Sequence, residues 1–256
     1  MTTLLCWCGV DSRGPTSLYV ATDSRFSWPE GQTWDAGRKI VVLPGQYGML
    51  ALAGDVTLVQ SLLLRLGTEK VTDELIAHQV VQLSDGYQSA ALRATAVVFA
   101  RRAGMSMDSS FQVTAHEFRA DSWVLVEHSI PVKHSKIVCA YGSGAGNAKA
   151  EVGLWTKDDS GNTSRSMFSG FCDALRKGKD PKTGGPPQLV GLYRSGPAME
   201  FGIVWESRLF LAGLTPSPKS DVAAFEWRND LLERCDPTTG QRLLDAQHHA
   251  RPYGLR

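Results

Sequence analysis

Thr2 is the residue whose position first suggests chemistry, because it directly follows the initiator methionine. A threonine hydroxyl is a poor nucleophile and needs a base close by. The α-amine of an N-terminal residue can act as that base, since its pKa lies at about 7.7–8.0 and the amine is partly neutral at neutral pH. This chemistry requires the removal of Met1, which a small residue at position two permits. The alternative is that Thr2 merely begins a strand.

The cysteines and histidines form no recognisable pattern of metal ligands. The five cysteines are odd in number and lack the paired CxxC spacing of a zinc site. Cys6 and Cys8 would share one face of a strand, but a structural zinc ion usually takes four ligands. His248 and His249 lie in a Pro/Gly/His-rich end that we expect to be solvated. We therefore expect neither a metal nor a cofactor, and the cysteine usage fits a reduced, cytoplasmic protein.

The composition is that of a globular chain large enough to bury a core. Of its 256 residues, 43% are hydrophobic and 21% are charged, and the formal net charge is +1. Without a basic block, composition gives no electrostatic reason to expect nucleic acid or a membrane as partner. No apolar run approaches the roughly 18–20 residues of a membrane helix. The first residues also lack the basic region and cleavage site of a signal peptide.

Hydrophobic periodicity predicts blocks of strands separated by pairs of helices. Apolar runs bounded by Gly, Pro and Asp indicate strands, and apolar residues three and four positions apart indicate helices, the first capped by Asp55. The expected strands cover residues 3–10, 17–23, 39–43, 47–53, 96–100, 111–118, 123–127, 137–141, 189–194, 201–205 and 209–212. The expected helices cover residues 58–66, 76–87, 148–155 and 166–176.

This order of elements favours an α+β fold and argues against a βαβ alternation. Two antiparallel sheets between two helical layers, a four-layer αββα sandwich, satisfy it. We expect residues 1–214 to form this domain. Residues 215–256 would then be a C-terminal extension with one helix over Val222–Leu232.

Several short motifs occur in a fixed order along the chain. Thr2-Thr3 precedes a strand, and Asp23-Ser24-Arg25 ends the second strand. Lys39 follows Asp23 by sixteen positions. Ala53-Gly54 precedes the helix that contains Gln60-Ser61-Leu62. Gly142-Ser143-Gly144 and Asp180-Pro181-Lys182-Thr183-Gly184-Gly185 come later.

In order and spacing, these motifs resemble the proteasome β-subunit family of the N-terminal nucleophile hydrolases. Each motif alone is weak, but together they are hard to obtain by chance. The resemblance runs from Thr2 to about Ala212. It implies that Lys39 sits beside Thr2 and supports proton transfer, with Asp23 as its counter-charge. Gly54 would offer its N–H to the oxyanion, and Ser143, Asp180 and Thr183 would orient the α-amine.

Each of these roles has a structural alternative. The Asp23–Lys39 pair could simply join two strands, and Gly54 could be a tight turn. Ser143, Asp180 and Thr183 could serve only as turn and loop caps. Thr183 also replaces the family's serine, which keeps the hydroxyl and adds a methyl group.

The resemblance also implies a substrate pocket made by Phe26, Ser27 and Leu52. Leu52 would form the floor of this pocket, with Gly37 and Val41 as its walls. Phe26 stands where the family generally has a small residue. The pocket should therefore be apolar and small.

The implied function is that of a threonine-type peptidase that acts on peptides or unfolded proteins in a homo-oligomeric ring. The chain length and the tail favour a bacterial proteasome homologue. Whether an ATPase unfoldase is a further partner is left open by the sequence. One alternative is a small-molecule amidase or acylase with the same nucleophile. Another is a non-catalytic shell subunit, against which the presence of Thr2, Asp23 and Lys39 argues.

Overall fold

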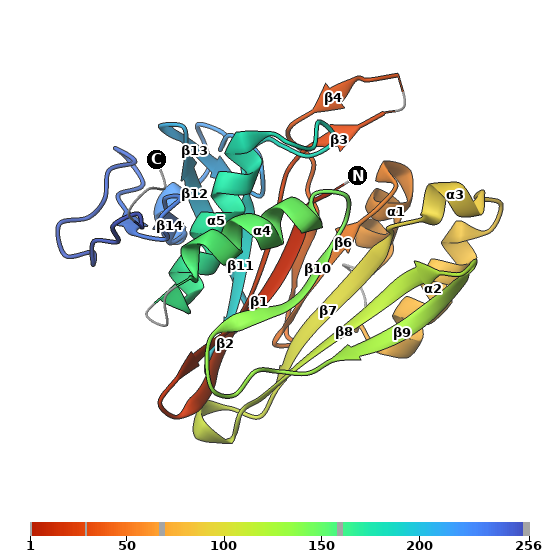
Figure 1. Cartoon of the computed structure of the whole chain (residues 1–256), viewed down its shortest axis with the longest axis horizontal. Coiled ribbons are helices and arrows are strands. Elements are labelled where there is room, and N and C mark those ends of the chain that lie inside the picture. Colours follow the sequence, from red (N-terminus) through yellow and green to blue (C-terminus); the bar gives the residue numbers. More distant parts are fainter. Residues whose placement is uncertain (1, 29, 67–69, 158–160, 253–256) are drawn as a thin grey trace.

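The computed structural model describes residues 2–28, 30–66, 70–157 and 161–252. Within these residues the chain is an α+β protein with two large β-sheets, a short hairpin and four longer helices (Figure 1). The hairpin is formed by β3 (Phe26–Ser27) and β4 (Thr33–Trp34) and projects from one end of the molecule. The predicted class is therefore confirmed.

The larger sheet has the strand order β10-β1-β2-β11-β12-β14-β15, with β13 paired to β12. Its pairs are antiparallel except β12 with β14, which run parallel. The prediction of purely antiparallel sheets is wrong for that one pair. The strands are β1 (Leu4–Asp11), β2 (Gly14–Thr22), β10 (Lys136–Tyr141), β11 (Gln188–Tyr193), β12 (Met199–Trp205), β13 (Arg208–Leu211), β14 (Trp227–Arg228) and β15 (Arg234–Cys235).

The smaller sheet is an antiparallel meander in chain order. Short connections join its consecutive strands, as hairpin signals in the sequence predict, except β6 and β7, between which the chain forms the helices of residues 56–92. Its strands are β5 (Ile40–Leu43), β6 (Gly48–Ala53), β7 (Ala96–Ala103), β8 (Ser110–Arg119) and β9 (Ser122–His128).

Three of the four longer helices begin at a capping side chain. Asp55 Oδ1 accepts the N–H groups of Thr57 and Leu58 at 2.9 and 3.2 Å, so the predicted cap is confirmed. The helices are α1 (Val56–Leu66), α2 (Asp73–Ser84), the short α3 (Ser89–Leu92), α4 (Ala145–Trp155) and α5 (Ser164–Lys177). In the part of the chain that the structure describes, none of them is long and apolar enough to cross a bilayer.

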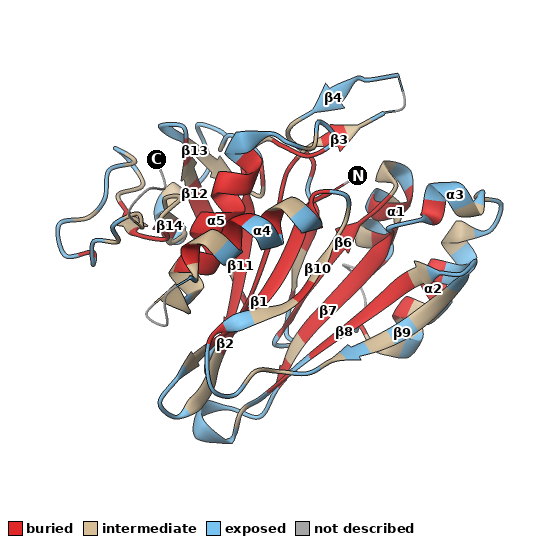
Figure 2. Cartoon of the chain, viewed as in Figure 1, coloured by how far each residue is buried: buried red, intermediate tan, exposed pale blue. Residues whose placement is uncertain are grey.

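Three hydrophobic clusters connect these elements, because alternate side chains of a strand point to opposite faces. On β1, Leu4 packs in a cluster shared by the two sheets, whereas Leu5 and Trp7 pack in a second cluster with α4 and α5. A third cluster joins the smaller sheet to α1 and α2. Figure 2 shows the resulting burial along the central strands.

The tail differs from its predicted form. Residues 222–232 contain a 3-10 turn at Val222–Ala224 followed by β14, and not the expected helix. Trp227 is 1% exposed and lies against Gly202 of β12, where an added Cβ would meet the indole at 2.4 Å. Pairing with β12 and burial of this indole outweigh the local helical preference. The tail thereby extends the larger sheet.

Candidate active site

The start of β1 and the end of β2 meet at Asp23. Because Leu4 pairs with Thr22, the residues just beyond them face each other. The Thr3 N–H donates to Asp23 Oδ1 at 2.9 Å, and the Asp23 N–H donates to the Thr3 carbonyl at 3.2 Å. Thr2, one residue earlier, is 1% exposed. Met1 lies outside the described residues, so its removal stays a prediction.

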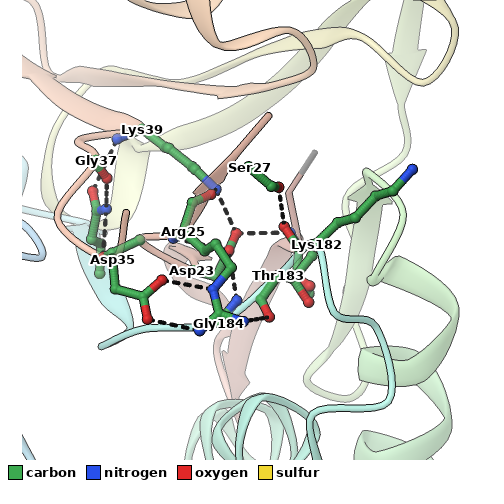
Figure 3. Close-up of polar contacts among 12 residues, drawn as sticks. Asp23, Arg25, Ser27, Asp35, Gly37, Lys39, Lys182, Thr183 and Gly184 are labelled. Carbon is green, nitrogen blue, oxygen red and sulfur yellow. Dashed lines mark hydrogen bonds and ion pairs between the residues drawn. The ribbon is translucent and has the colours of Figure 1, made fainter. Parts of the chain in front are cut away.

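Lys39 enters the same point from the beginning of β5. Its ammonium donates to Asp23 Oδ1 at 2.8 Å and to the Arg25 carbonyl at 2.6 Å (Figure 3). The side chains of Lys39 and Asp23 are 1% and 0% exposed. Burial lowers the pKa of Lys39, and the Asp23 carboxylate opposes that shift. Each charge is thus stable in the interior only in the presence of the other.

The second carboxylate oxygen of Asp23 binds a third part of the chain, the loop that contains Gly184. Asp23 Oδ2 accepts the N–H of Gly184 at 3.0 Å and that of Arg25 at 3.2 Å. One carboxylate therefore connects the start of β1, Lys39 and the Asp180–Gly185 loop. The structure brings these parts of separate motifs together (Figure 3).

The Gly142–Gly144 turn lies against the first residues of the chain. The Gly144 N–H donates to the Thr2 carbonyl at 3.3 Å. An added Cβ at Gly142 would lie 2.0 Å from that carbonyl oxygen, and one at Gly144 would lie 1.8 Å from Thr3 Oγ1. Only glycine permits so close an approach, and Gly142 also has a φ of +87°. Ser143, between the two glycines, is exposed.

The Asp180–Thr183 segment forms a turn beside this one. The Thr183 N–H and Oγ1 both donate to the Asp180 carbonyl, at 3.1 and 3.3 Å. Asp180 Oδ1 accepts the Lys182 N–H at 3.0 Å, while Oδ2 is buried and has no partner among the described residues. Asp180 and Thr183 therefore cap their own loop, and Thr183 lies next to Gly144.

Gly54 lies where β6 gives way to α1. Leu52, two residues earlier, donates its N–H to the Lys39 carbonyl at 2.9 Å, so β6 runs beside Lys39. Gly54 has a φ of +139°, and an added Cβ would lie 2.4 Å from Thr95 Oγ1. The backbone conformation and the contact with Thr95 both require glycine here.

The residues predicted to line the pocket are mostly buried. The Phe26 ring is 3% exposed and lies under Gly37, 5.9 Å from the Trp34 ring and 5.5 Å from Lys39 Nζ. Leu52 is 0% exposed and belongs to the cluster with α1, against which Val41 packs. Ser27 Oγ donates to the Lys182 carbonyl at 3.0 Å.

Sequence reasoning gave no role to Arg25, Asp35 or Gln188. Arg25 forms a bidentate pair with Asp35, both contacts 2.7 Å, and also donates to the carbonyls of Pro181 and Thr183. Gln188 accepts the Lys39 N–H at 3.1 Å and donates to Ser24 Oγ and the Gly37 carbonyl. Arg25 belongs to the Asp23-Ser24-Arg25 motif, so the sequence held a signal for its role. No pattern in the sequence pointed to Asp35 or Gln188.

The solved structures that resemble the chain include two of BPH and one of HslV. BPH from Thiobacillus denitrificans is 17% identical, covers 76% of this chain and 99% of its own, and gives a TM-score of 0.51. The same BPH in complex with epoxomicin is 16% identical, with 77% and 100% covered and a TM-score of 0.50. HslV from Trypanosoma brucei is 13% identical, with 75% and 99% covered and a TM-score of 0.46.

No family model matches the sequence, and no curated protein matches it significantly. The two BPH structures therefore establish a likeness of fold. The chain has the fold of Thiobacillus denitrificans BPH.

Proposed function

We propose that this chain, which has the fold of Thiobacillus denitrificans BPH, is a threonine-type peptidase whose nucleophile is Thr2 after removal of Met1. The observation that carries the proposal is the shared acceptor Asp23 Oδ1. It binds the N–H next to Thr2 at 2.9 Å and the buried ammonium of Lys39 at 2.8 Å. A lysine buried close to the first residues of the chain can lower the pKa of neighbouring groups and so help to activate an N-terminal nucleophile.

In the proposed mechanism the α-amine of Thr2 takes the proton from the Thr2 hydroxyl, whose oxygen attacks the amide carbonyl. The protonated amine then gives this proton to the leaving nitrogen as the C–N bond breaks, and water hydrolyses the resulting ester on Thr2. Lys39, with its pKa lowered by burial, supports this transfer as a positive charge beside the reacting group. The Gly54 N–H would stabilise the tetrahedral oxyanion, a contact typically worth about 3–4 kcal/mol. Ser143, Asp180 and Thr183 would position the amine through the Gly142–Gly144 turn, which contacts Thr2 and Thr3, and the Asp180–Thr183 turn beside it.

We also propose the finer architecture. The three hydrophobic clusters support a four-layer αββα arrangement with the sheets at the centre. The peptidase chemistry belongs to residues 1–214, and residues 215–256 are an extension. The proposed setting is a cytoplasmic homo-oligomeric ring that takes peptides or unfolded proteins, with an ATPase unfoldase as a further partner. Light scattering tests the ring, and the mass of a single chain at micromolar concentration would reject it.

The decisive experiment measures intact mass and peptide cleavage on the same preparation. We expect the mass to lack Met1 and to increase by one molecule of epoxomicin per chain after incubation, with loss of cleavage. Epoxomicin is the compound bound to BPH in one of the similar structures. Thr2→Ala should take up no epoxomicin. Retention of Met1 in active enzyme would contradict Thr2 as the nucleophile.

A small-molecule amidase is the second candidate, and one observation favours it. Phe26 fills the space under Gly37 and beside Lys39, which leaves less room for a large side chain. Parallel assays with fluorogenic peptides and with small aliphatic amides separate the two activities. Hydrolysis of the amides without any peptide cleavage would favour the amidase.

A further inference from the structure

A cavity whose lining does not include Thr2 lies on the face of the larger sheet that packs against α5. It has a volume of about 390 Å³. Tyr19, Tyr193 and Phe201 line it from three neighbouring strands, β2, β11 and β12. The first turn of α5 contributes Arg165, and the tail contributes Arg228. The tail thus encloses a space that the sheet and α5 leave open.

The charged groups of this cavity have one sign. Arg165 and Arg228 line it, and among the described residues no carboxylate does. Arg228 Nη1 donates to the Leu232 carbonyl at 3.0 Å, and Arg228 Nη2 donates to the Glu226 carboxylate. Glu226 does not line the cavity. Its Nε is buried and has no partner among the described residues. A buried guanidinium N–H without an acceptor is costly unless a ligand supplies one.

Of the neutral polar groups of the cavity, Tyr193 supplies a further donor, whereas Gln247 Oε1 accepts from Arg165 Nη2 at 2.7 Å. Tyr19 donates its hydroxyl proton to the Tyr193 hydroxyl at 2.9 Å, which leaves the Tyr193 proton for another acceptor. Burial raises the pKa of Tyr193, so this proton is retained at neutral pH. At the start of α5, Thr163 Oγ1 accepts the Ser166 N–H, whereas the N–H groups of Ser164 and Arg165 have no partner within the helix.

The cavity therefore combines aromatic side chains of the sheet with donors contributed by a strand, a helix and the tail. The guanidinium of Arg228 lies 5.7 Å from the centre of the Phe201 ring, so charge and apolar surface are adjacent. Arginine N–H groups match the oxygens of carboxylates and phosphates, and charge-assisted hydrogen bonds of this kind are the strong ones. The volume falls in the range of small-molecule sites.

We propose that this cavity binds a small organic anion that carries a carboxylate or phosphate group on a planar apolar body. Arg165, Arg228 Nε and the Tyr193 hydroxyl bind the anionic group, and the body lies against Tyr19 and Phe201. This site is separate from Thr2 and does not depend on the proposed peptidase activity.

The test is calorimetric titration of the full chain with benzoate and with phenyl phosphate. Neutral benzamide and inorganic phosphate are run in parallel. We expect one of the two aromatic anions to bind at least tenfold more tightly than benzamide and than inorganic phosphate. The tighter of the two shows whether a carboxylate or a phosphate is preferred. Equal binding of benzamide would overturn the proposal. So would the absence of binding by either aromatic anion at about 10 mM, a concentration of order 100 times a typical KM.

Three variants locate the binding. Arg165→Gln and Tyr193→Phe each keep the bulk of the side chain, and each should weaken the anion at least tenfold, about 1.4 kcal/mol. Arg228→Gln should do the same, and its circular dichroism is compared with wild type because Arg228 also contacts the tail. Arg208→Gln is the matched control, since Arg208 lies over the Phe210 ring outside this cavity. Unchanged affinity in Arg165→Gln and Tyr193→Phe would refute the site. Thr2→Ala should bind like wild type.

Discussion

Lys39 Nζ lies 2.8 Å from Asp23 Oδ1, and neither side chain is more than 1% exposed. Two opposite charges in such a place depend on each other, because removal of one leaves the other buried without compensation. The pair is therefore structural and, in the proposed mechanism, functional. Mutations have to separate these two roles.

Lys39→Ala should abolish cleavage and lower the free energy of unfolding by about 3–5 kcal/mol, since it leaves the Asp23 carboxylate unpaired. The double variant Asp23→Asn/Lys39→Met removes both charges and should recover much of that stability without recovering activity. Urea unfolding and peptide turnover are measured on both proteins. Cleavage by the double variant would show that Lys39 has no chemical role.

Thr2→Ala should leave the fold intact and remove cleavage, because only the nucleophilic hydroxyl and one methyl group are lost. Thr2→Ser keeps a hydroxyl and should retain activity. Turnover by folded protein is the measurement. A Thr2→Ala enzyme within about tenfold of wild type in kcat/KM would end the proposed mechanism.

Gly142→Ala should displace the start of β1, because its Cβ would lie 2.0 Å from the Thr2 carbonyl oxygen at a φ of +87°. A shift of about 1 Å at a reacting group can cost roughly 100-fold in rate, and we expect a loss of that order in kcat. Gly146→Ala is the control, since nothing lies within 4 Å of its added Cβ. Equal activity of the two variants would separate this turn from the site.

Phe26→Ala should widen the proposed pocket. The Phe26 ring is buried under Gly37, and its removal opens an apolar space beside Lys39. The kcat/KM for peptides with Tyr or Trp before the scissile bond should rise by about 10–200-fold relative to peptides with a small apolar residue there. This is the change expected for a pocket effect of about 1–3 kcal/mol. A fluorogenic peptide series varied at that position measures this. Wild-type preference for basic or acidic residues would contradict the apolar pocket.

The stability of the protein should decrease at alkaline pH. Burial raises the pKa of Cys8 from its ordinary 9.0 to about 12. The folded state therefore binds more protons than the unfolded state above pH 9, so this stabilisation is complete below pH 9 and is lost as the pH rises toward 12. Cys8→Ala should show a shallower decline of unfolding free energy between these values. An identical slope of unfolding free energy against pH in both proteins would contradict a raised pKa of Cys8 as the cause.

Much of the fold follows from short-range patterns in the sequence. Alternation along Leu4–Trp7 separates the side chains that face the other sheet from those that face α4 and α5. Asp55 caps α1 as predicted, because a side-chain cap acts within three residues. Asp23 and Lys39, sixteen positions apart, also form the predicted pair, because the β3–β4 hairpin between them returns the chain from the end of β2 to the start of β5.

Only the tertiary structure decided the rest, because the partners lie far apart in the chain. The segment at Trp227 carried a helical pattern, yet it pairs with β12 because the indole is buried against Gly202. Arg25 and Asp35 gain their role only when the loop at Thr183 is brought beside them. The cavity of Tyr193, Arg165 and Arg228 likewise joins residues from a strand, a helix and the tail. Hydrophobic periodicity determines on which face of a helix or strand a residue lies. Long-range pairing determines which other element packs against that face.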